Sequence, residues 1–96
     1  MTARTIRLRV AGRVQGVGYR DFLRGEAESR GLVGWVRNRR DGTVEAIICG
    51  AAEGVDELIA ACWRGPPASR VADIQVEASP KDADLPTTGF TIRPSA

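Results

Sequence analysis

The chain has 96 residues, a length that favours one compact domain spanning residues 1–96. Its 14 Lys and Arg residues against 12 Asp and Glu leave a net charge of +2, well short of the basic excess of a dedicated nucleic-acid binder. The sequence contains no His, the side chain that most often shuttles protons near neutral pH. Any catalysis by this chain must therefore proceed without imidazole.

Two cysteines, Cys49 and Cys62, lack the CxxC spacing of a metal site, and no His is present to complete one. We interpret both as small buried apolar residues rather than as metal ligands or a disulfide. The sequence also lacks a membrane-spanning apolar run of about 18 residues and an N-terminal signal peptide. These features predict a cytoplasmic protein with no metal and no other cofactor.

The first predicted element is a strand over residues 5–12. Ile6, Leu8 and Val10 alternate there with polar residues, the pattern of a strand with one buried face. Glycines then recur three times within residues 12–18, too often for a helix or a central strand. This segment is predicted to be a loop with unusual backbone geometry.

A helix is predicted to follow the loop. Asp21 is suited to its N-cap or first turn, and Gly31 supplies a stop at its C-terminal end. One side of the helix is apolar, with Tyr19, Phe22, Leu23 and Ala27.

The next two predicted strands form a hairpin. Residues 33–39 alternate, with Trp35 and Arg37 on one face and Asn38 among the residues on the other. The Asp41-Gly42 pair precedes a second strand at residues 43–49 and predicts a two-residue type I′ turn. Three arginines near this hairpin are interpreted as solvated or as a guide for anionic substrates, namely Arg37, Arg39 and Arg40.

A second helix and two further strands complete the chain. The helix has an apolar stripe that must lie on the sheet, formed by Val55, Leu58, Ile59 and Cys62, and it ends at Gly65. Residues 71–78 predict a strand whose inward residues are Ala72, Ile74 and Val76, and residues 79–88 predict a polar loop. Phe90 and Ile92 mark a short last strand.

The order β-α-β-β-α-β with a short extra C-terminal strand predicts an α+β fold. We expect a two-layer sandwich, with both helices on one face of a mainly antiparallel sheet. The β-α-β crossover makes the strands at residues 5–12 and 33–39 parallel to each other. The loop after the first strand and Asn38 at the end of the second are therefore expected at the same edge of the sheet.

The glycine-rich loop outlines an anion site, because backbone N–H groups can converge where a loop enters a helix. Gly16 and Gly18 permit left-handed conformations, and Arg20 can grip two phosphate oxygens as a fork. A glycine-rich connection without a ligand explains the same string equally well. Asn38 can hold a water without titrating, although its position alone favours a simple hydrogen-bonding role before the hairpin.

Two blocks of this sequence resemble the acylphosphatase signature closely. The first runs from Gly12 to Arg20, and the second runs from Gly31 to Asn38 and is followed by Asp41-Gly42-Thr43-Val44-Glu45. The blocks are correctly ordered and spaced, and the resemblance extends over most of the chain. The first block departs slightly from other members, because Gly18 and Tyr19 stand where Cys and Phe are frequent.

The resemblance implies a ferredoxin-like fold and metal-independent hydrolysis of acyl phosphates to a carboxylate and inorganic phosphate. By motif position, Arg20 is implied to bind the phosphoryl group and Asn38 to orient the attacking water. The cradle is implied to be the loop backbone, formed by Gln15, Gly16, Val17, Gly18 and Tyr19. The partners expected are a small-molecule acyl phosphate and phosphate, with no nucleic acid, no membrane and a monomeric protein.

The alternative is a non-catalytic ferredoxin-like module that binds an anion or RNA, because one fold serves many functions. RNA-recognition sheets display stacked aromatic residues, whereas residues 43–49 contain none and the chain is only 5% aromatic. A role inside a larger transferase or maturation assembly is a third possibility, which the length of the chain disfavours. The site residues, rather than the fold, must decide between these functions.

Overall fold

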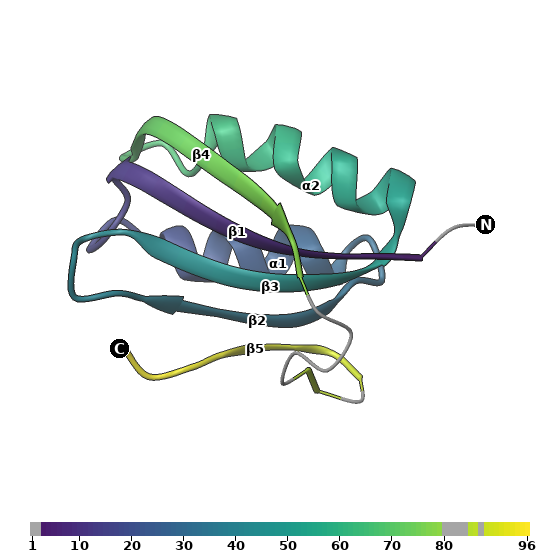
Figure 1. The fold of residues 1–96 in the computed structure, drawn as a ribbon. Helices are drawn as coiled ribbons and strands as arrows, with labels where there is room; N and C mark the ends of the chain where they lie inside the picture. Colours follow the sequence, from purple (N-terminus) through teal and green to yellow (C-terminus); the bar gives the residue numbers. More distant parts are fainter. Residues whose placement is uncertain (1–2, 80–84, 87) are drawn as a thin grey trace.

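A computed structural model describes residues 3–79, 85–86 and 88–96. The described elements alternate in the predicted β-α-β-β-α-β order and end with a fifth strand (Figure 1). They are β1 (Ala3–Arg13), α1 (Tyr19–Glu28), β2 (Val33–Asn38), β3 (Val44–Ala51), α2 (Ala52–Arg64), β4 (Arg70–Ala78) and β5 (Phe90–Ile92). The polar loop predicted at residues 79–88 lies largely outside the described residues.

The strands form one sheet in the order β4-β1-β3-β2-β5. Every described pairing is antiparallel except the one between β2 and β5, which is parallel. Both helices cover the same face of this sheet, and the other face carries no helix (Figure 1). The predicted α+β sandwich is therefore confirmed, and β1 and β2 run parallel on either side of β3.

The core lies between the sheet and the two helices. Directly paired residues of β1 and β3 point into it, including Ile6 opposite Ile48 and Leu8 opposite Ala46, all at most 1% exposed. The two helices supply the opposite wall, formed by Tyr19, Leu23, Ala27, Val55, Leu58, Ala61 and Cys62. Of the predicted apolar faces, Phe22 and Ile59 are only partly buried. Alternation thus correctly identified the buried face of β1, with Ile6, Leu8 and Val10 all at most 1% exposed.

The edge strand β4 differs from its prediction. A bulge shifts the register so that Ala11 pairs with Asp73 and Gly12 with Val71, which leaves Ala72 without a paired residue. Val71 and Ile74 pack against the core, whereas Ala72 is exposed. The prediction of Ala72 as an inward residue was wrong because the extra residue of a bulge breaks strict alternation.

Val76 was also predicted to be inward, yet it is 40% exposed. It pairs with the buried Leu8 and so shares its face of the sheet. An edge strand has a neighbour on one side only, which explains why Val76 stays open to solvent on the same face that buries Leu8.

The turn between β2 and β3 is longer than the predicted two-residue type I′ turn. Gly42 N–H donates to Arg39 O at 3.1 Å, and Arg39 N–H donates to Thr43 O at 2.8 Å. Only Gly42 in this turn has positive φ, at 91°, whereas a type I′ turn requires positive φ at both central residues. The hairpin therefore has a three-residue loop with a left-handed glycine at its last position.

Helix α1 begins at Tyr19, so Asp21 takes the first-turn position rather than the N-cap, the other position predicted for it. Gly18 occupies the N-cap. The two cysteines are free, as predicted. Cys62 is buried, as predicted. Cys49 is only partly buried, on the face of the sheet that carries no helix, where its Sγ accepts a hydrogen bond from Thr5 Oγ1 at 3.2 Å.

The helix-free face of the sheet, called the open face below, is organised around Glu45. This residue is 1% exposed, and its carboxylate accepts hydrogen bonds from Arg7, Arg37 and Arg39. Arg37 Nε lies 2.8 Å from Glu45 Oε1, and Arg39 lies 3.1 Å from the same oxygen. Arg37 and Arg39, interpreted from the sequence as solvated or as a guide for anionic substrates, thus form ion pairs with Glu45 while their side chains stay 27% and 30% exposed.

Burial by itself raises the pKa of Glu45, but the hydrogen bonds from Arg37, Arg7 and Arg39 outweigh it and hold the pKa below its ordinary value. A carboxyl group with a lowered folded-state pKa stabilises the fold above its unfolded-state pKa of about 4.3. This contribution is lost as the pH falls through the lower, folded-state pKa.

We predict that Glu45→Gln lowers the free energy of unfolding at pH 7 by about 3 kcal/mol. This is the low end for breaking a buried ion pair, because the arginine partners still reach water. Urea unfolding should be measured at several pH values from 7 down to 2. The difference in the free energy of unfolding between Glu45→Gln and the unmodified protein should become smaller as the pH drops. Glu28→Gln, on an exposed residue of α1 on the opposite side of the sheet, serves as the control. Equal stability of the Glu45→Gln protein at pH 7 contradicts the prediction.

Candidate active site

The loop at residues 14–18 connects β1 to α1 and has the geometry of an anion cradle. Gly16 and Gly18 have φ values of 74° and 81°, the left-handed region that other residues seldom adopt. The N-cap of α1 is Gly18, which has no side chain that could accept a hydrogen bond from the first turn of the helix. The first N–H groups of α1 therefore have no side-chain cap, which suits an anionic ligand.

Tyr19 fixes the position of this helix end. Its side chain is 1% exposed, and its hydroxyl donates a hydrogen bond to the carbonyl oxygen of Cys62 in α2 at 2.7 Å. Burial, with the contact to Cys62, raises the pKa of Tyr19 far above its usual range, so the hydroxyl remains a neutral donor. The aromatic ring thus belongs to the core and anchors the start of α1 on α2.

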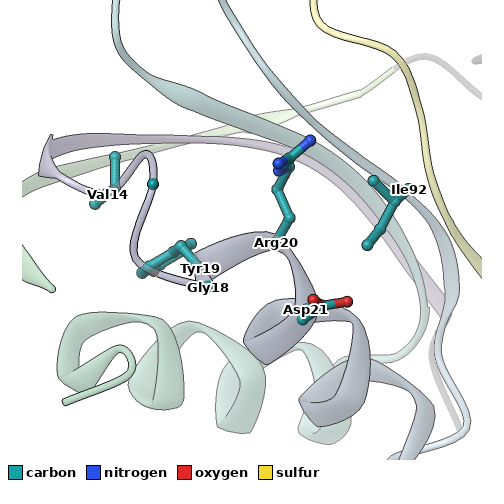
Figure 2. Close-up of a pocket in the computed structure, with 7 residues that line it drawn as sticks. Val14, Gly18, Tyr19, Arg20, Asp21 and Ile92 are labelled. Carbon is teal, nitrogen blue, oxygen red and sulfur yellow. The ribbon is translucent and has the colours of Figure 1, made fainter. Parts of the chain in front are cut away.

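A pocket of about 170 Å³ opens beside the loop and the start of α1. Figure 2 shows the guanidinium of Arg20 pointing away from the helix, with Ile92 of β5 across the pocket and Asp21 turned in another direction. The guanidinium forms no hydrogen bond or ion pair with the described residues, whereas Asp21 accepts one from Arg24 at 3.0 Å. Arg20 therefore offers a partly buried positive charge to a ligand.

Asn38 is the last residue of β2 and lies at the end of the sheet where β1 also finishes, since Val10 of β1 and Asn38 both pair with Val44 of β3. Its main-chain oxygen accepts a hydrogen bond from Ala96 N–H at 3.0 Å. Its side-chain oxygen, Oδ1, is buried and has no hydrogen-bond partner among the described residues. A buried acceptor without a partner costs about 1–3 kcal/mol, so this atom calls for an explanation.

Gln15 connects the cradle to the hairpin. Its Nε2 donates to Arg39 O at 2.7 Å and to Thr43 O at 2.9 Å. Arg39 directly follows Asn38, and Gln15 directly precedes the first glycine of the cradle. One side chain therefore spans the two segments that carry the predicted site residues.

The structure brings only part of the predicted set into the pocket. Arg20 lines the pocket together with three of the predicted cradle residues, namely Gly16, Gly18 and Tyr19. Gln15, Val17 and Asn38 are not among the lining residues. Val17 is instead partly buried against the core.

Sequence reasoning did not identify three other residues that line the pocket, which are Val14, Asp21 and Ile92. Val14 directly precedes the predicted cradle and lies within the motif, and Asp21 directly follows Arg20. Ile92 reaches the pocket because β5 pairs with β2, with Ile92 opposite Val36. A strand order of this kind has no signal in one isolated sequence.

Neither a metal site nor a membrane-spanning helix is found in the part of the chain that the structure describes. Within residues 3–79, 85–86 and 88–96, no group of three or more His, Cys, Asp or Glu side chains is arranged to hold a metal ion. In the same part of the chain, neither helix has the length and apolar character needed to cross a membrane.

The family model described as Acylphosphatase matches residues 6–92, which include the loop, Arg20, Asn38 and the hairpin. The chain belongs to the acylphosphatase family. A curated acylphosphatase of Rhodopseudomonas palustris is 55% identical over 73 residues, which are 76% of this chain and 74% of the relative. An acylphosphatase of Rhizorhabdus wittichii is 49% identical over 89 residues, 93% of this chain and 87% of the relative.

The fold agrees with this membership. The crystal structure of acylphosphatase from Bacillus subtilis superimposes with a TM-score of 0.86 at 39% identity, covering 96% of this chain and 99% of the other. The ferredoxin-like fold expected from the sequence is therefore confirmed. As an acylphosphatase, the protein is a hydrolase that acts on acyl phosphates.

Proposed function

We propose that the protein hydrolyses acyl phosphates by in-line attack of a water molecule, with Arg20 and Asn38 as the catalytic residues. Arg20 and the backbone amides of residues 15–19 hold the phosphoryl group, and Asn38 orients the water. The observation that carries this assignment is the buried, unpartnered Oδ1 of Asn38, at the same sheet edge as a guanidinium without a partner among the described residues. The site thus presents an acceptor for a water and a donor for a phosphate.

Phosphoryl transfer depends mainly on positioning and on stabilising charge at the equatorial phosphate oxygens. The uncapped amides of α1 and its N-terminal dipole stabilise that charge without any change of protonation. Arg20 adds a planar fork that can bind two oxygens, each charge-assisted hydrogen bond contributing about 1.5–3 kcal/mol. The pocket is smaller than the roughly 300–1,000 Å³ typical of sites for drug-sized ligands, which suits a phosphoryl group.

The leaving group explains why imidazole is unnecessary. A carboxylate whose conjugate acid has a pKa near 4 departs without being protonated by the enzyme. The remaining task is to align a water opposite the departing oxygen. Asn38 suits it because a carboxamide oxygen accepts a hydrogen bond from water and stays uncharged at every physiological pH.

The binding-module alternative is less well supported. Trp35 is the aromatic residue that the described strands place on the open face, and it is only 6% exposed. The guanidiniums of Arg37 and Arg93 lie 4.9 and 4.8 Å from the centre of its ring. A nucleobase could not stack there without displacing both. We therefore propose that the protein has no nucleic-acid partner. The proposed function is that of a cytoplasmic monomer that acts on a small acyl phosphate, as the resemblance implies.

We predict that Asn38→Ala lowers kcat for benzoyl phosphate by about 100-fold or more, because the water is no longer aligned. Competitive inhibition by inorganic phosphate should be retained, since the cradle and Arg20 are intact. Steady-state hydrolysis of benzoyl phosphate with added phosphate measures both quantities. Near-normal turnover would remove Asn38 from the mechanism.

Arg20→Lys keeps the positive charge but loses the fork, and it is expected to lower kcat/KM by about 10- to 150-fold, the equivalent of one charge-assisted hydrogen bond. The inhibition constant of phosphate should rise as well. Arg24→Lys is the matched control, one turn further along α1 and outside the pocket lining. An unchanged kcat/KM in Arg20→Lys rules out the bidentate role.

Catalysis by this set of groups needs no metal, so hydrolysis of benzoyl phosphate is expected to be unchanged after dialysis against EDTA. The rate should be measured before dialysis, after dialysis and after adding magnesium back. A loss that magnesium specifically restores would indicate a metal-assisted phosphatase instead.

A further inference from the structure

The proposed mechanism uses groups from two separate segments. The phosphoryl cradle belongs to the connection between β1 and α1, whereas Asn38 belongs to the end of β2. β1 and β2 are not neighbours in the sheet, because β3 lies between them. The distance between water and phosphorus therefore depends on whatever joins the loop to the hairpin.

We infer that Gln15 is a positioning residue, whose side-chain amide sets the location of Asn38 relative to the phosphoryl cradle. Both hydrogens of its Nε2 are used, one toward Arg39 O at 2.7 Å and one toward Thr43 O at 2.9 Å. Arg39 is bonded directly to Asn38 in the chain. This inference rests on the proposed roles of Arg20 and Asn38, and it assigns Gln15 a side-chain role beyond the contribution of its backbone to the cradle.

The two carbonyl groups that Gln15 binds do not depend on it for a hydrogen-bond partner. Arg39 O also accepts from Gly42 N–H at 3.1 Å, and Thr43 O also accepts from Arg39 N–H at 2.8 Å. Removing the Gln15 amide therefore leaves both carbonyls bonded and the hairpin closed. What it removes is the connection between hairpin and loop, so the loss should appear in catalysis more than in folding.

In-line attack is sensitive to such a change, because a displacement of 1 Å can cost about 100-fold in rate. Phosphate binding depends on the loop backbone and Arg20, which Gln15 does not contact through its side-chain amide. Loss of the connection should therefore lower kcat while leaving the affinity for phosphate nearly unchanged.

A double-mutant cycle with benzoyl phosphate tests this inference. Gln15→Met preserves the length of the side chain without its donors, and it is expected to lower kcat by about 10- to 100-fold. The inhibition constant of inorganic phosphate should stay within about threefold. Because Gln15 acts through Asn38, the Gln15→Met/Asn38→Ala protein should have the same kcat as Asn38→Ala alone.

The pH profile of Gln15→Glu gives a second readout that a purely structural role would not produce. Above its pKa, the introduced carboxylate faces two carbonyl oxygens with no hydrogen to donate, whereas the protonated carboxyl can donate to one of them. Its pKa should lie above the usual value of about 4.3, since those carbonyls disfavour the charged form. The kcat ratio of variant to unmodified protein should thus recover as the pH falls from about 6 to about 4. This variant retains the shape of Gln and keeps the test available if Gln15→Met is unstable.

Gln75 provides matched controls, because it is an exposed Gln on the edge strand β4. Gln75→Met and Gln75→Glu should match the unmodified protein in kcat at every pH. Any of three results overturns the inference. The first is that Gln15→Met lowers kcat by the same factor in the unmodified protein and in Asn38→Ala, and the second is that the inhibition constant of phosphate rises in step with the loss of kcat. The third is a kcat ratio of Gln15→Glu to unmodified protein that does not change with pH. Normal turnover of Asn38→Ala overturns the proposed role of Asn38, and the inference with it.

Discussion

The buried carboxylate of Glu45 constrains the arrangement of the central strands. A carboxylate that is 1% exposed is tolerated only with charged partners, and here they are Arg7 of β1, Arg37 of β2 and Arg39 just after β2. Strand side chains alternate between faces, so sliding β3 by one residue would move Glu45 from this cluster into the apolar layer beneath the helices. The same slip would expose Ala46 and Ile48, which are buried in that layer. The ion cluster and the apolar core therefore specify one register from opposite faces of the sheet.

Arg39 connects this cluster to the active site. Its guanidinium binds Glu45 on the open face, while its main chain closes the hairpin and its carbonyl oxygen accepts a hydrogen bond from Gln15. The residue that follows Asn38 is thus held through both its side chain and its backbone. A turn held at so many points is a rigid support for Asn38, the residue proposed to orient the attacking water. The constraint that sets the register of β3 thereby extends to the end of β2.

The elements could be predicted from one sequence because each has a local signal. Alternation identified the buried face of β1, and glycines marked the loop before α1 and the end of α2. The errors arose where a non-local contact overrides the local pattern. Ala72 alternates correctly along its own strand but lies at a bulge against Gly12. The ion pairs of Arg37 and Arg39 with Glu45 form only once β2 pairs with β3, which no local pattern in the sequence indicates. The motif predicted Arg20, which lines the pocket, whereas Ile92 enters the pocket only through the parallel pairing of β5 with β2.

In the proposed mechanism, no catalytic group changes its charge near neutral pH. A guanidinium stays charged at physiological pH, and backbone amides and the carboxamide of Asn38 stay uncharged there. Because no catalytic group gains or loses a proton, a shifted pKa cannot increase the rate of hydrolysis. The rate depends instead on where the atoms of the site are held. The fold provides this through many small contacts: Tyr19 ties the start of α1 to α2, Gln15 ties the loop to the hairpin, and Ala96 N–H binds the main-chain oxygen of Asn38. The lack of His agrees with a reaction whose leaving group needs no proton. Catalysis without imidazole then depends mainly on how the backbone positions the reacting groups.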